Sequence, residues 1–236
     1  MQSIDISSTY HDILSQIRTA EATYGRLPNS VQLLAVSKKQ PIEKIRQLAD
    51  CGHHAFGESY VQEAIEKINQ LSDRSLTWHF IGPIQSNKTK LIAEHFSWVH
   101  SVDRLKIAQR LNQQRPESLP RLNICIQVNV SLEPTKSGFL PDELLPAVEK
   151  IRQLPHLVIR GLMVIPAPAE QFVVQRQQFK HAHDLLKQLQ TIVPDADTLS
   201  MGMSADLEAA IAEHSTCVRI GTALFGHRWK PHLTMP

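Results

Sequence analysis

Residues 31–48 of the chain read VQLLAVSKKQPIEKIRQL, an apolar run followed by a helical pattern. The apolar run predicts a buried β-strand, because it is short, continuous and rich in aliphatic side chains. Pro41 then opens a segment in which apolar residues recur at helical spacing. This stretch therefore predicts one βα unit, with Lys38 at the carboxyl end of its strand.

The same alternation of strand and helix continues along the chain, with no long linker and no break in composition. Alternation of this kind is typical of a parallel sheet. We expect strands near 31–37, 54–57, 77–81, 98–102, 122–130, 157–165, 197–201 and 217–221. We expect helices near 41–51, 59–71, 87–95, 103–114, 141–153, 170–191 and 204–213, with a short segment after the last strand.

Eight such units in a chain of 236 residues favour a single closed (β/α)₈ TIM barrel. An open doubly wound sheet is the alternative, but no glycine-rich dinucleotide fingerprint follows the first strand. Helical spacing of apolar residues near 4–24 predicts an extra helix before the barrel. We therefore expect one α/β domain over 1–236, with the barrel at about 31–228 and a loose tail from Trp229.

The composition argues against several classes of partner. Lys and Arg number 25 against 23 Asp and Glu, without a long basic run, so we expect no nucleic-acid or membrane partner. The start carries no secretory signal pattern, and no apolar stretch is long enough to span a bilayer. The three dispersed cysteines are typical of reduced thiols, and no metal-binding motif is present. We expect a soluble, cytoplasmic monomer without a metal.

Active sites of such barrels lie at the carboxyl ends of the strands, which makes Lys38 a candidate. A lysine held there and partly desolvated can lose its proton and form a Schiff base with an aldehyde. A solvated lysine beside Lys39 is the simpler interpretation of this segment taken alone.

A phosphate-binding pattern follows the last two predicted strands. Ser204 is a natural N-cap for the predicted helix 204–213, and a helix start binds anions. Gly221 permits close backbone approach and Thr222 offers a hydroxyl group. Phosphate sites in barrels commonly lie in these two loops. A Schiff-base lysine opposite a monophosphate site indicates pyridoxal 5′-phosphate (PLP) as the ligand.

Arg219 shares a strand face with Gly221, because alternate residues of a strand point the same way. An arginine inside the barrel needs a partner, since a buried unpaired charge is costly. Two partners are open. Arg219 either donates to the pyridine nitrogen of PLP, which then stays unprotonated, or forms an ion pair with a strand-end acid such as Glu58.

Six short motifs follow one another along the chain. They are AVSK at 35–38, FGESYVQE at 56–63, WHFIGPIQSNK at 78–88, KSG at 136–138, LSMGMS at 199–204 and VRIGT at 218–222. In this order they resemble the motifs of the pyridoxal phosphate homeostasis proteins, which are related to the N-terminal barrel of alanine racemase. The resemblance runs from about residue 8 to residue 228.

The resemblance implies a PLP barrel of fold type III in which Lys38 carries the cofactor as an internal aldimine. It places the phosphate near Ser204, Gly221 and Thr222, and the pyridine nitrogen near Arg219. Lys136 matches a second lysine of the family, one linked to transient handling of PLP. Further candidates for the cofactor pocket are Ser59, His79, Asn129 and Met203.

The chain departs from the family pattern at two positions. It has Ser59 where the family usually has asparagine, and the serine hydroxyl reaches less far. It has Ala205 where the family usually has an acid. The loss of this charge at a helix start lowers the favourable interaction with the helix dipole by under about 1 kcal/mol.

Two functions fit these residues, and we predict the first. A carrier would hold PLP without catalysis and release it to apo-enzymes, which keeps vitamin B6 and amino-acid pools balanced. A PLP-dependent amino-acid racemase is the alternative, and it needs a base on each face of the substrate carbanion. No tyrosine follows a late strand to supply the second base, which leaves Tyr60 as the candidate. A sugar-phosphate barrel is a third interpretation and leaves Lys38 without a role.

Overall fold

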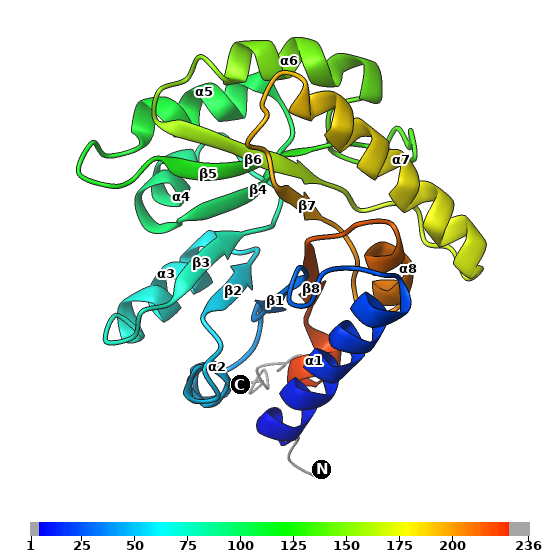
Figure 1. Ribbon diagram of the computed structural model, residues 1–236. Coiled ribbons are helices and arrows are strands. Elements are labelled where there is room, and N and C mark those ends of the chain that lie inside the picture. Colours follow the sequence, from blue (N-terminus) through cyan, green and yellow to red (C-terminus); the bar gives the residue numbers. More distant parts are fainter. Residues whose placement is uncertain (1–4, 227–236) are drawn as a thin grey trace, which may run out of the picture.

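A computed structural model describes residues 5–226, and the strands of this part close into a parallel barrel (Figure 1). Each strand pairs with the next one in sequence, and the last pairs with the first. The strands are β1 (Gln32–Val36), β2 (Ala55–Glu58), β3 (Thr77–Phe80), β4 (Trp98–Val102), β5 (Leu122–Gln127), β6 (Leu157–Met163), β7 (Thr198–Ser200) and β8 (Cys217–Ile220). The predicted closed barrel is confirmed, and the alternative of an open doubly wound sheet is wrong.

Helices alternate with the strands and surround the barrel (Figure 1). A 3₁₀ turn, η1 (Pro141–Glu143), precedes one of them. The helices of the repeating units are α2 (Ile42–Asp50), α3 (Val61–Gln70), α4 (Thr89–His95), α5 (Leu105–Gln114), α6 (Leu144–Ile151), α7 (Phe172–Gln190), α8 (Leu207–Ala212) and α9 (Thr222–Phe225). Most lie within two residues of the expected ranges. The exceptions are β5, which ends at Gln127, α6, which begins at Leu144 after the 3₁₀ turn, and α8, which begins at Leu207.

The continuous apolar runs of the strands follow from their position between two packed layers. In β1, the consecutive residues Leu33, Leu34 and Ala35 are all buried. One side of the strand faces the barrel interior and the other side faces the helices, so both faces exclude water. The helices are amphipathic instead, and α2 buries Ile45 and Leu48 on the face turned to the barrel.

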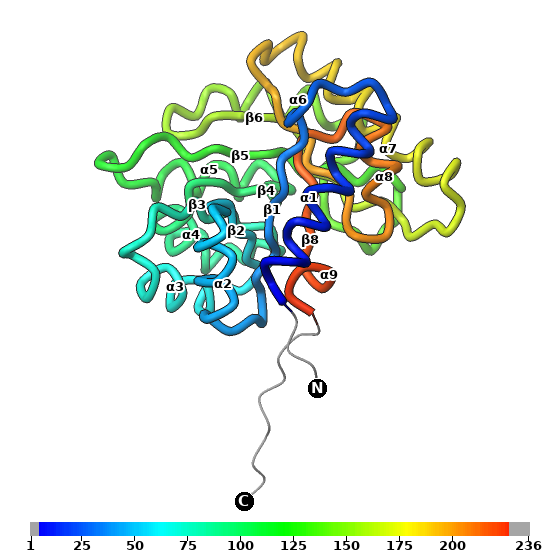
Figure 2. Tube along the Cα trace, turned by 60° about the horizontal axis from the view of Figure 1, so that its bottom comes forward, coloured from blue at the N-terminus to red at the C-terminus, as the bar shows by residue number. Residues whose placement is uncertain are grey.

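The predicted extra helix is α1 (Ile6–Thr23), which packs against α2, α8 and α9 near the seam between β1 and β8 (Figure 2). Its buried Glu21 accepts hydrogen bonds from the backbone N–H groups of Val31 and Asn29, at 2.7 and 3.1 Å. Arg18 donates to the same carboxylate. Because Val31 directly precedes β1, Glu21 fixes the point at which the chain enters the barrel.

Parts of the expected domain range lie outside the described residues, namely residues 1–4, residues 227 and 228, and the tail from Trp229. The extent of a single domain over 1–236 therefore stays a prediction. Within residues 5–226, no helix is both long enough and apolar enough to cross a membrane.

Gly161 in β6 provides a test of how tightly the strands pack. Its φ is 151°, and a Cβ atom there would lie 1.8 Å from the carbonyl oxygen of Thr198 in β7. We expect Gly161→Ala to lower the free energy of unfolding, measured by urea denaturation, by at least about 2 kcal/mol.

The matched control is Gly52→Ala. Gly52 also has a positive φ, 88°, but an added Cβ would meet nothing within 4 Å. Gly52→Ala should lower the free energy of unfolding only by the cost of its strained backbone conformation, about 1 kcal/mol. Equal losses in the two variants would contradict the steric explanation.

Candidate functional site

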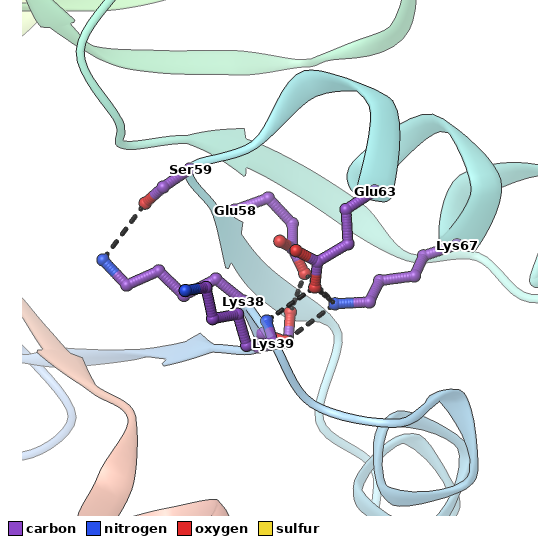
Figure 3. Close-up of polar contacts among 7 residues, drawn as sticks. Lys38, Lys39, Glu58, Ser59, Glu63 and Lys67 are labelled. Atoms are coloured by element: carbon purple, nitrogen blue, oxygen red, sulfur yellow. Dashed lines mark hydrogen bonds and ion pairs between the residues drawn. The ribbon is translucent and has the colours of Figure 1, made fainter. Parts of the chain in front are cut away.

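Lys38 lies two residues beyond β1, at the rim formed by the carboxyl ends of the strands. Its Nζ atom donates to the Oγ atom of Ser59 at 3.3 Å (Figure 3). Ser59 directly follows β2, which runs parallel to β1 with Gly57 opposite Val36. This register brings the two rim residues together. The lysine is half-buried and has a hydrogen-bond partner.

A buried ion-pair cluster lies beside Lys38 (Figure 3). The Lys67 Nζ atom of α3 is 2.8 Å from a carboxylate oxygen of Glu58 and 2.5 Å from one of Glu63. Glu58 is fully buried, and this burial raises the pKa of its carboxyl group, while Lys67 acts in the opposite direction. Lys67 is not among the residues predicted from the sequence. The only signal was its helical i,i+4 spacing from Glu63, which is more often a surface pair.

The two expected phosphate-binding segments lie next to each other. The backbone N–H of Arg219 donates to the carbonyl oxygen of Gly202 at 2.9 Å, which joins the loop after β7 to β8. A Cβ atom at Gly221 would lie 3.3 Å from the carbonyl oxygen of Val36, so this glycine approaches the end of β1 closely. Thr222 begins α9, whose first N–H groups have no acceptor within the helix.

The predicted capping role of Ser204 is wrong. Helix α8 begins at Leu207 with Asp206 as its N-cap residue. The carboxylate of Asp206 accepts the backbone N–H of Met203 at 2.6 Å, and this bond closes a turn before the helix starts. Ser204 and Met203 are exposed in the loop, so the hydroxyl of Ser204 is available to a ligand rather than used as a cap.

Arg219 lies inside the barrel and is 5% exposed. Its guanidinium group donates to the carbonyl oxygen and hydroxyl of Ser200, at 2.6 and 2.8 Å, and to the carbonyl oxygen of Val164 at 2.9 Å. Burial lowers its pKa from the usual value. The alternative ion pair between Arg219 and Glu58 does not form, because Glu58 is held by Lys67 on the helix side of β2.

His79 belongs to a buried polar chain that ends at Arg219. Its Nδ1 atom is 2.9 Å from Nε2 of His100, and Nδ1 of His100 is 2.8 Å from the hydroxyl of Ser200. Burial lowers the pKa of His79 to about 3 and that of His100 well below its usual range. Both rings are therefore neutral near pH 7.

The cavity that His79 lines is not at the rim where Lys38 lies. It opens near the amino-terminal ends of the strands, beside Gln32, Trp98 and Thr198. His100 and Ser200 are not predictable partners of His79 from the sequence, because only the closed barrel brings them to it.

Asn129 and Lys136 lie together at the carboxyl rim. The side-chain amide of Asn129 donates to the carbonyl oxygens of Glu133 and Lys136, at 2.8 and 3.4 Å, and so supports the loop after β5. Lys136 pairs with the Glu133 carboxylate at 2.8 Å. With Met163, the two residues line a cavity of about 270 Å³.

The sequence left Tyr60 as the candidate second base of a racemase, and it contained no metal-binding motif. Tyr60 is exposed, and the Nζ atom of Lys39 lies 5.3 Å from the centre of its ring. Over residues 5–226, no group of three or more histidine, cysteine, aspartate or glutamate side chains is arranged to hold a metal ion.

Comparison with known proteins identifies close relatives. The model of the alanine racemase N-terminal domain matches residues 13–229. The pyridoxal phosphate homeostasis protein of Pseudomonas aeruginosa is 54% identical over 223 residues, covering 94% of this chain and 96% of that protein. The solved structure of PipY from Synechococcus elongatus PCC7942, with PLP bound, is 41% identical with a TM-score of 0.78, and the match covers 89% of this chain and all of PipY.

A more distant likeness shows the fold alone. Alanine racemase of Clostridium difficile 630 is 17% identical with a TM-score of 0.70. The match covers 93% of this chain and 58% of the racemase chain.

The buried neutral histidines predict a loss of stability in mild acid. The unfolded chain binds protons at histidine near pH 6.5, whereas folded His79 stays neutral down to about pH 3. Stability therefore falls as the pH drops through this window, by about 1–2 kcal/mol per buried histidine between pH 7 and pH 5. We expect His100→Asn to show a smaller fall than the wild type in urea denaturation.

The control for this experiment is His54→Asn, since His54 is exposed. Its pH dependence should match that of the wild type. If the stability of His100→Asn had the same pH dependence as that of the wild type, buried His100 would not contribute to the loss of stability in acid.

Proposed function

The chain belongs to the pyridoxal phosphate homeostasis protein family, which is built on the alanine racemase N-terminal domain, and we propose that it holds PLP covalently through Lys38. PLP offers an aldehyde to a primary amine and a phosphate to hydrogen-bond donors. The observation that carries the proposal is the placement of the Lys38 amine beside Ser59, with Gly221 against the end of the same strand.

The rim residues fit such a ligand. The hydroxyl groups of Ser204 and Thr222 suit a phosphate, because each can donate a hydrogen bond to its oxygens. The missing side chain at Gly221 lets this loop lie close to the end of β1, because an added Cβ would crowd Val36. We therefore propose that these three residues hold the phosphate group and that Met203 flanks the cofactor.

Arg219 suits the ring nitrogen of the cofactor. Three of its five N–H donors bond to Ser200 and Val164, which fixes the plane of the guanidinium group. The remaining donors can bond to an unprotonated pyridine nitrogen. We propose that the hydroxyl of Ser59 contacts the amine of Lys38. His79 lines the cavity near the amino-terminal ends of the strands, and Asn129 lines the cavity at the carboxyl rim.

We propose a carrier without catalytic activity that passes PLP to apo-enzymes in the cytoplasm and acts as a monomer. The racemase alternative needs a base opposite Lys38. Its candidate, Tyr60, is exposed and packs against Lys39. Exchange of the α-proton of an L-amino acid in deuterium oxide, at an enzymatic rate, would establish the racemase instead.

We expect the purified protein to gain a visible absorption band with PLP, and borohydride to trap the cofactor on Lys38. Lys38→Ala should lose the band and the trapped adduct, because no amine then faces the aldehyde. Peptide mapping by mass spectrometry identifies the modified residue. Lys39→Ala is the matched control and should keep both signals. An adduct on another lysine would refute the assignment.

The phosphate assignment predicts a selective change in affinity. Thr222→Val and Ser204→Ala should each raise the Kd for PLP by about threefold to tenfold, because each removes one hydrogen bond to a charged group. The Kd for pyridoxal, which lacks the phosphate, should stay the same. Both constants can be measured by fluorescence titration, and a parallel rise in the two would contradict the assignment.

A further inference from the structure

The residues on each side of Lys38 are held by side chains from β2 and α3 (Figure 3). The Lys67 Nζ atom donates to the carbonyl oxygen of Ser37 at 2.8 Å, and the Ser37 hydroxyl donates to Glu58 at 2.7 Å. The backbone N–H of Lys39 donates to Glu63 at 2.6 Å. Lys38 lies between these two anchored residues.

The anchored segment has a conformation that it would not keep unaided. Lys39 has a φ of 58°, in the left-handed region that residues with a side chain rarely adopt. The N–H of Gln40 bonds to the carbonyl oxygen of Ser37 at 3.0 Å and closes the turn. Such a conformation persists where the surroundings determine it, and it is common at functional sites.

Lys67 connects all of these contacts. It is 6% exposed, and its ammonium group bonds at once to Glu58, Glu63 and the carbonyl oxygen of Ser37. Three donors on one ammonium match three acceptors, so the buried charge is fully compensated. Removal of Lys67 would release the Ser37 carbonyl and leave two carboxylates facing each other beside the turn.

We propose that Lys67, acting with Glu63, is a positioning residue that holds the turn at 37–39 so that the Lys38 amine faces the cofactor aldehyde. Lys67 acts through the backbone of the turn. The inference rests on the proposed function of Lys38. In this proposal, α3 supports the covalent capture of PLP by Lys38, and other residues bind the phosphate.

The first test uses Lys67→Met, with Lys67→Arg as the conservative variant. We expect Lys67→Met to slow formation of the borohydride-trapped Lys38 adduct by at least about tenfold, and Lys67→Arg to restore much of the rate. In a Lys38→Ala background, Lys67→Met should leave the Kd for PLP unchanged, because the phosphate contacts do not involve the turn.

The second test needs no cofactor. In the protein without PLP, the Lys39 amide should exchange its hydrogen at least about tenfold faster in Lys67→Met and in Glu63→Ala, as followed by NMR. Glu63 is more exposed than Lys67, so Glu63→Ala carries the test if Lys67→Met does not fold.

Arg115→Met is the matched control. Arg115 is also a buried cation that donates to backbone carbonyls, those of Ala93, Phe96 and Pro120, but it directly follows α5 and is not among the residues that hold the turn. It should leave the adduct rate and the Lys39 exchange rate as in the wild type. Equal slowing in this control would overturn the inference.

The two proposals fail in different ways. A wild-type rate of adduct formation in Lys67→Met, or unchanged Lys39 exchange, would overturn the positioning role and leave PLP binding in place. A wild type that forms no adduct would overturn the role of Lys38 in PLP binding.

Discussion

The pairing of β8 with β1 is the contact on which the rim depends. The two strands align from Gln32 opposite Cys217 to Ala35 opposite Ile220. This register brings together two segments that are far apart in sequence, so that Gly221 lies against the last residue of β1. Without closure, the amine of Lys38 and the loops suited to a phosphate would lie at opposite edges of an open sheet.

Two separate polar networks flank the rim. The pair of Lys67 and Glu58 lies between β2 and the helix layer, and Arg219 lies inside the barrel with carbonyl and hydroxyl partners. Each buried cation, Lys67 and Arg219, is hydrogen-bonded by its own set of neighbours. Lys38 stands between them, and the barrel wall separates their charges. This separation explains why Arg219 and Glu58 do not pair.

Periodicity predicted the strands and the barrel, because it reports which faces of each element exclude water. It could not show which buried polar groups meet. His100 and Ser200 reach His79 only across the closed barrel. Lys67 has the spacing of a surface pair but is buried by β2. The start of α8 was misplaced because Asp206, not Ser204, bonds back to the loop.

The closure between the first and last strands also has a consequence for the order of folding. Contacts between β1 and β8 join residues about as far apart in sequence as the barrel allows, and such contacts form slowly. On the ribosome, Lys38 emerges long before Gly221 and Thr222. Under the proposed function, a nascent chain would present the Lys38 amine before the loops proposed to hold the phosphate exist, and selective capture of PLP would begin only when synthesis has passed the last strand.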